Sequence, residues 1–146
     1  PSCRSPRPFL RWGGPVSAGT WLLVADFLGR PTTTNKAHNM HHRAVSADRK
    51  RWRTAGAQLA RVSRVPACEA ITVACWGRYP NRSSLPDADA VAPALKGFLD
   101  GLVDAGVVPD DDGRYVHAIT YRRPEVAFGQ PALCVLVAAV RAEGET

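Results

Sequence analysis

Two groups of aspartates flank a short apolar segment within residues 85–112. Asp87 and Asp89 precede the segment, Asp110, Asp111 and a third aspartate follow it, and Lys96 lies between the groups. Like charges repel one another, so a fold that gathers several carboxylates needs a cation to hold them together. Oxygen ligands select a hard ion such as Mg²⁺ or Mn²⁺ rather than Zn²⁺. This stretch is therefore a candidate magnesium site.

The apolar residues between the two groups predict how the groups meet. They follow helical spacing at Leu95, Phe98, Leu99, Leu102 and Val103. Pro93 suits the first helical position and Gly106 suits a left-handed stop. Such a helix is roughly 18 Å long at about 1.5 Å per residue, and an extended tail to Asp111 covers roughly 16 Å at about 3.3 Å per residue. A chain that turns back at Gly106 would return Asp110 and Asp111 to the helix start.

Each acidic group also has a purely structural explanation. The run DADA before the helix could be a solvated loop, since carboxylates are favourable near a helix N-terminus, and PDDDG could be a polar turn. Asp100, four residues after Lys96, could form a surface ion pair with it or orient it. Taken together, the two groups, the lysine and the return geometry favour the metal site.

The run KGFLDGLVDAGVVPDDD, residues 96–112, resembles the motif of the RusA-type Holliday junction resolvases, small endonucleases of phages and prophages. In that family a Lys, an Asp four residues later and a following Asp-Asp pair recur, here Lys96, Asp100, Asp110 and Asp111. With lower specificity the similarity extends from about residue 21 to 140. The run RPTTTNKAH, residues 30–38, is similar to the family's Pro-x-x-x-Asn loop.

The acidic loop departs from the family pattern. The compact form has Asp-x-Asp-Asn with Lys four residues after the second Asp, whereas Ala90 replaces the Asn here and Lys96 follows Asp89 by seven residues. A longer variant of the motif fits Asp87, Pro93 and Lys96 but has a Pro and an Asn that this chain lacks. Either Asp87 or Asp89 could therefore be the metal ligand, and loss of the Asn could reduce activity.

The resemblance implies a Mg²⁺-dependent endonuclease, with Mn²⁺ as a possible substitute, that resolves four-way DNA junctions by paired cleavage in recombination and repair. It implies a homodimer, because a junction needs two symmetric nicks. It implies catalytic roles for Asp87, Asp89, Lys96 and Asp111, with metal binding by Asp87, Asp89, Asp110 and Asp111. The alternative is a non-catalytic or degenerate nucleic-acid-binding protein of the same fold. A metal-dependent phosphohydrolase acting on nucleotides is a weaker option.

The net charge of +6 is unevenly distributed. Residues 1–82 hold fourteen Lys and Arg against three Asp and Glu, whereas residues 83–146 hold five against ten. A basic half beside an acidic half suits a polyanion, because one half neutralises phosphates while the other holds ions. Basic surfaces are nevertheless common on proteins that bind nothing specific. The predicted nucleic-acid contacts are Asn35, Lys36, Arg49, Lys50, Arg53, Arg78 and Arg82.

Aromatic and imidazole groups near these cations have structural explanations. Trp52 lies among the charged residues of a predicted helix, and we assign its ring to the core. The run HNMHH contains His38, His41 and His42, but no Cys or further His stands at partner spacing for a metal site. We therefore expect these histidines to be structural or to contact phosphate.

The chain of 146 residues, 45% hydrophobic, is expected to form one RusA-like domain over residues 20–142 after a disordered basic segment, residues 1–19. The sequence predicts an α/β (α+β) fold, a small mixed β-sheet in β-α-β-α-β-β order with helices packed on it. Expected strands cover residues 20–28, 68–78, 114–123 and 132–140, the last two as an antiparallel hairpin. Helices are expected over 46–62 and from residue 93 to about 105.

Composition also restricts location and cofactors. No run of eighteen apolar residues is present, so no membrane span is expected. The four cysteines show no paired spacing, which favours a reducing cytoplasm and argues against a zinc site. Cys75 and Cys134 lie in apolar runs, where cysteine acts as a small hydrophobe. No motif for an organic cofactor is found.

Overall fold

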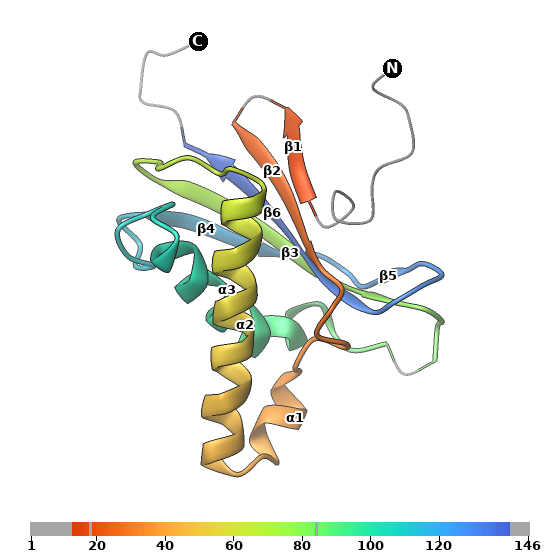
Figure 1. The fold of residues 1–146 in the computed structure, drawn as a ribbon. Coiled ribbons are helices and arrows are strands. Elements are labelled where there is room, and N and C mark those ends of the chain that lie inside the picture. Colours follow the sequence, from red (N-terminus) through yellow and green to blue (C-terminus); the bar gives the residue numbers. More distant parts are fainter. Residues whose placement is uncertain (1–12, 18, 84, 141–146) are drawn as a thin grey trace.

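A computed structural model describes residues 13–17, 19–83 and 85–140, which form one mixed sheet with helices on one face (Figure 1). The strands are β1 (Gly13–Ser17), β2 (Thr20–Ala25), β3 (Ile71–Tyr79), β4 (Val116–Tyr121), β5 (Glu125–Val126) and β6 (Ala132–Ala139). The helices are α1 (Thr34–His38), α2 (His42–Val62), the short 3₁₀ helix η2 (Ala88–Val91) and α3 (Ala92–Asp104). The predicted α+β class, with helices packed on a mixed sheet, is confirmed. In the described ranges no helix is long and apolar enough to cross a membrane.

The sheet has the strand order β1-β2-β6-β3-β4, with β5 paired to the end of β3. β4 runs parallel to β3, because α3 crosses between the two strands, whereas β6 lies antiparallel between β2 and β3. The predicted hairpin of the last two long strands is therefore wrong. β6 is buried on both faces from Leu133 to Val135 and takes a central place, while the exposed β4 takes the edge.

Two further expectations need correction. Residues 1–19 were expected to be disordered, but Gly13–Ser17 form β1 and pair with β2; residues 1–12 and 18 lie outside the described residues. The helix expected from Ser46 begins at His42, because the Nδ1 atom of His41 caps it by accepting a hydrogen bond from the backbone N–H of Arg43 at 3.2 Å.

Glycines allow α2 and α3 to pack closely, side by side across the sheet (Figure 1). A Cβ atom on Gly97 would lie 2.7 Å from the carbonyl oxygen of Arg49, and one on Gly56 or Gly101 would overlap backbone atoms of the facing helix. The apolar stripe of α3, including Leu95, Phe98 and Leu102, fills the space between α2 and the sheet. The charged residues of α3 lie outside this apolar stripe.

Candidate functional site

Asp87 and Asp89 lie at the start of α3, on a short structure that the core holds in place. Asp87 precedes η2, and its carbonyl oxygen accepts a hydrogen bond from the N–H of Ala90 at 3.1 Å. The side chain of Val91 is buried, and the hydroxyl of Thr34 in α1 donates to the Ala90 carbonyl at 3.5 Å. Both carboxylates are exposed, so solvent or a ligand can reach them.

The second acidic group follows α3 in a tail that two buried valines fix. Gly106 ends the helix with φ of 81°, as the sequence predicted, and the chain then turns back. Val107 is fully buried and Val108 nearly so, and the carbonyl of Val107 accepts from Cys68 N–H at 2.7 Å. The tail is thus anchored between α3 and the sheet before it reaches the aspartates.

Lys96 of α3 contacts the second acidic group. Its Nζ lies 2.5 Å from Oδ2 of Asp111. Asp111 is only 17% exposed at its side chain, and the backbone N–H of the same residue donates to Oδ1 of Asp110 at 2.8 Å. The hydrogen bond from Lys96 lowers the pKa of Asp111 and outweighs burial, which acts in the opposite direction. Asp111 is therefore held as a carboxylate at the first turns of α3.

The other predicted metal ligands do not gather around Asp111. The negative charge of Asp89 contributes, after burial and Cys75, to raising the pKa of Tyr121 at the end of β4. Within residues 13–17, 19–83 and 85–140, no three Asp, Glu, His or Cys side chains lie close enough together to hold a metal ion. The chain thus brings Asp111 to Lys96, but it does not draw three of the four predicted ligands into one group.

Asp100 does not contact Lys96 as either alternative supposed. It accepts hydrogen bonds from Arg49 of α2, with Nη2 at 3.0 Å. One turn further, Arg53 donates to Asp104 at 2.5 Å, and this contact lowers the pKa of the Asp104 carboxyl. Arg49 and Arg53 were predicted to contact nucleic acid, and their guanidinium groups here join α2 to α3.

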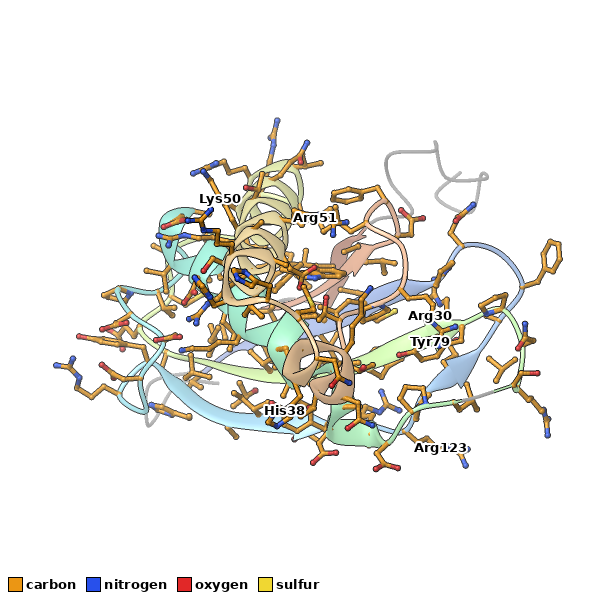
Figure 2. All side chains as sticks on the ribbon, turned by 90° about the horizontal axis from the view of Figure 1, so that it is seen from below. Arg30, His38, Lys50, Arg51, Tyr79 and Arg123 are labelled. Carbon is orange, nitrogen blue, oxygen red and sulfur yellow. The ribbon has the colours of Figure 1, made fainter. Side chains whose placement is uncertain are left out.

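The other predicted nucleic-acid contacts are distributed over three surfaces. Asn35 and Lys36 are exposed on α1, which the Thr34 hydrogen bond ties to η2. Lys50 is exposed on α2 (Figure 2). Arg78 donates to Glu125 of β5 at 3.2 Å, whereas Arg82 is exposed in the loop before η2. The chain therefore presents Asn35, Lys36 and Arg82 near the acidic loop and Lys50 away from it.

Trp52 and His41 make contacts that hold the fold together. Trp52 is 1% exposed and donates through Nε1 to the hydroxyl of Thr32 at 3.1 Å. His41 caps α2, and its ring centroid lies 4.2 Å from that of His42. His38 is exposed in the last turn of α1, beside η2 (Figure 2).

The sequence analysis did not identify Trp76, Arg122 or Arg123 as site residues, although it named their neighbours Arg78 and Arg82. Trp76 of β3 and Arg122, just after β4, contact each other. Both line a hollow of about 700 Å³, together with Arg82 and Arg123. Trp76 and Arg78 alternate with buried residues along β3, so period-two spacing could have placed both on the face opposite the helices. Their proximity to Arg122 depends on the parallel pairing of β3 with β4, which no local pattern reveals.

No protein-family model matches the sequence, and no curated protein matches it.

Proposed function

We propose that this protein is a Mg²⁺-dependent, structure-selective DNA endonuclease of the RusA type. The observation that carries the proposal is the contact between Lys96 and Asp111, because the RusA-like motif contains both residues and fifteen positions separate them in the chain. A turn that is only a polar surface feature would not require contact between its aspartate and Lys96. The exposed Asp87 and Asp89 lie just before the helix that carries Lys96.

The proposed roles follow from the chemistry of each side chain. Asp87, Asp89 and Asp111, with Asp110 assisting, supply the oxygen ligands that Mg²⁺ or Mn²⁺ prefers. Such an ion, when bound, supplies the charge that activates water and stabilises the leaving 3′ oxygen. Lys96 keeps Asp111 ionised before metal arrives, and its ammonium group is within reach of negative charge that develops on a phosphate. In this proposal Asp111 pairs with Lys96 when no ion is bound and would turn to the ion when one binds.

The proposed substrate is branched DNA, cut symmetrically by a homodimer. Asn35, Lys36 and Arg82 flank the acidic loop and are suited to bind phosphates on either side of the scissile bond. The junction preference and the dimer come from the resemblance alone, and both belong to the proposal. The process served would be recombination or repair.

The test uses a synthetic four-way junction with Mg²⁺ and, separately, with a chelator. We expect paired nicks only with the metal, and we expect Asp111→Asn to lower the cleavage rate at least a hundredfold. Asp104→Asn is the matched control, since it removes the same charge from α3 at a residue paired with Arg53. Its cleavage rate should stay within about twofold, because exposed ion pairs contribute roughly 0–1 kcal/mol.

The rival function is a non-catalytic nucleic-acid-binding protein of the same fold. Two observations favour it: Ala90 replaces the family's Asn, and no three ligand side chains of the described chain are gathered. Junction binding without metal-dependent nicking, unchanged by Asp111→Asn, would establish the rival and remove the nuclease proposal.

A further inference from the structure

The hollow beside Trp76 lies on the face of the sheet that α2 and α3 leave uncovered. Trp76 packs with Val24, Ala132 and Cys134 in a small apolar cluster separate from the main core. Arg122, Arg123 and β5 line the hollow, and so do Arg82 and Leu85 from the loop before η2. That loop continues directly to Asp87, so the hollow borders the candidate catalytic loop.

The ring of Trp76 is fixed in position. Its Nε1 donates to Oε1 of Glu125 at 3.0 Å, and Nε of Arg78 donates to the same oxygen at 3.2 Å. The hydrogen bond from Trp76 is the largest cause that lowers the pKa of Glu125, so this carboxylate stays charged. The guanidinium carbon of Arg122 lies 4.9 Å from the Trp76 ring centroid, which is a cation–π geometry.

The hollow carries an excess of positive charge. Three arginines line it, and in the part of the chain that the structure describes none of Arg82, Arg122 and Arg123 forms an ion pair with a carboxylate. The one acidic residue in the lining, Glu125, is already paired with Arg78. Figure 2 shows Arg123 at the end of the sheet that holds Tyr79 and Arg30, away from Lys50 on α2.

We propose that this hollow binds one unpaired nucleotide of a DNA strand. The base would stack on the Arg122–Trp76 pair, and its phosphate would lie between Arg82 and Arg123. Bases stack on aromatic rings and on guanidinium planes, and an exposed base face requires that the nucleotide be unpaired. Arginine recognises phosphate through paired N–H donors. The exposed Leu85 and Val126, 38% and 42% exposed, provide apolar contact for the sugar or base.

This inference rests on the proposed function for its substrate, and it requires that a base pair opens at the branch point so that an unpaired nucleotide lies beside the scissile phosphate. An acidic peptide could satisfy the arginines equally well, but it would leave the planar Arg122–Trp76 surface unused. A measurement of how much the base adds to the binding affinity therefore distinguishes a nucleotide from an acidic peptide.

The experiment measures binding of the full chain to fluorescent single strands in a chelating buffer, so that cleavage plays no part. Oligothymidylate is compared with an abasic strand of equal length and charge. We expect the wild type to bind oligothymidylate roughly tenfold more tightly, in line with measured stacking contributions. Arg122→Ala should abolish this preference, and Arg122→Lys should abolish most of it, because lysine keeps the charge but lacks the plane.

Arg61→Ala is the matched control, because it removes the same charge at the far end of α2, where Arg61 contacts the Asp104 carbonyl. It should lower affinity for both strands equally, by about twofold or less. Circular dichroism checks that each variant folds. Equal affinity of the wild type for the two strands would overturn the inference, as would competition by polyglutamate as effective as that by oligothymidylate. Single-strand binding that persists while junctions remain uncut would overturn the nuclease proposal and leave this one standing.

Discussion

The ammonium nitrogen of Lys96 lies 2.5 Å from a carboxylate oxygen of Asp111, across fifteen residues of chain. The contact exists because α3 stops at a left-handed Gly106, and because Val107 and Val108 are buried immediately afterwards. The lysine is half exposed and the aspartate largely shielded, at 52% and 17% side-chain exposure. An ionised carboxylate is therefore held against α3 by the lysine.

Removing the lysine should raise the pKa of Asp111. In the folded protein this pKa lies below the ordinary value of 3.8, chiefly because of the hydrogen bond from Lys96. Because the folded-state pKa is lowered, the Lys96–Asp111 interaction stabilises the fold fully at pH values above 3.8. This stabilisation is lost as the pH falls through the lowered pKa of Asp111. We expect Lys96→Met to shift the Asp111 titration upward, because the carboxylate loses the hydrogen bond that chiefly lowers its pKa. Carboxyl-carbon chemical shifts followed against pH measure it.

Asp112 provides an internal control in the same spectra. Its pKa is also lowered, but by Arg114, which donates through Nη2 at 2.8 Å. Lys96→Met should leave the Asp112 titration unchanged. An unshifted Asp111 signal in the variant would mean that the Lys96 contact does not persist in solution.

Local patterns predicted the helix of the site well. Pro93, the apolar stripe and Gly106 each reflect chemistry within one or two turns, and α3 spans Ala92–Asp104 with that stripe against the core. The return of the tail to Lys96 was predicted from the similar lengths of the helix and of the extended tail to Asp111. These features depend on bond geometry and on burial, which the sequence records directly.

The same local patterns did not predict which strands pair in the sheet or which side chains pair between the helices. β6 and β4 are adjacent in predicted order, yet β3 separates them, because burial on both faces puts β6 at the centre. Arg49 and Arg53 were predicted to contact nucleic acid, and the sequence did not reveal that the crossing of α2 with α3 gives them Asp100 and Asp104 as ion-pair partners. Such partners depend on which face of one helix meets the other, and charge counts along the chain do not contain that information.

The close crossing of the two helices should make Gly101 intolerant of any side chain. A Cβ atom there would overlap the carbonyl oxygen of Arg53 and lie 2.6 Å from the backbone nitrogen of Ala57. Backbone atoms cannot move aside as a flexible side chain can, so we expect Gly101→Ala to lower the free energy of unfolding by roughly 3 kcal/mol. Urea denaturation measures the change. Gly113→Ala, where no atom lies within 4 Å of the added carbon, should change it by less than about 1 kcal/mol in either direction.

The buried cysteines should resist alkylation in the folded protein. Burial raises the pKa of Cys75 to about 12 and that of Cys134 to about 11, so almost no thiolate forms at pH 8. Cys68 is partly exposed, and its pKa is raised by a smaller degree of burial. Among the three cysteines that the structure describes, we expect iodoacetamide at pH 8 to modify Cys68 first, and Cys75 and Cys134 only after urea is added. Peptide mass spectrometry follows each site, and fast labelling of Cys75 in native buffer would contradict its place in the sheet.

A buried threonine should control both stability and the position of α1. The hydroxyl of Thr32 donates to Asp48 at 2.6 Å and accepts from the indole N–H of Trp52 at 3.1 Å, and Thr32 is 4% exposed. Thr32→Val keeps the shape but leaves that N–H unsatisfied, which costs about 1–3 kcal/mol. Thr32→Ser should restore most of the loss, and Thr54→Val on the exposed side of α2 should cost much less. Because Thr32 fixes the loop that leads to α1, Thr32→Val should also weaken junction binding if Asn35 contacts DNA. Denaturation and binding measured on the same preparations decide between the two effects: a stability loss without a binding loss would remove α1 from the proposed DNA surface.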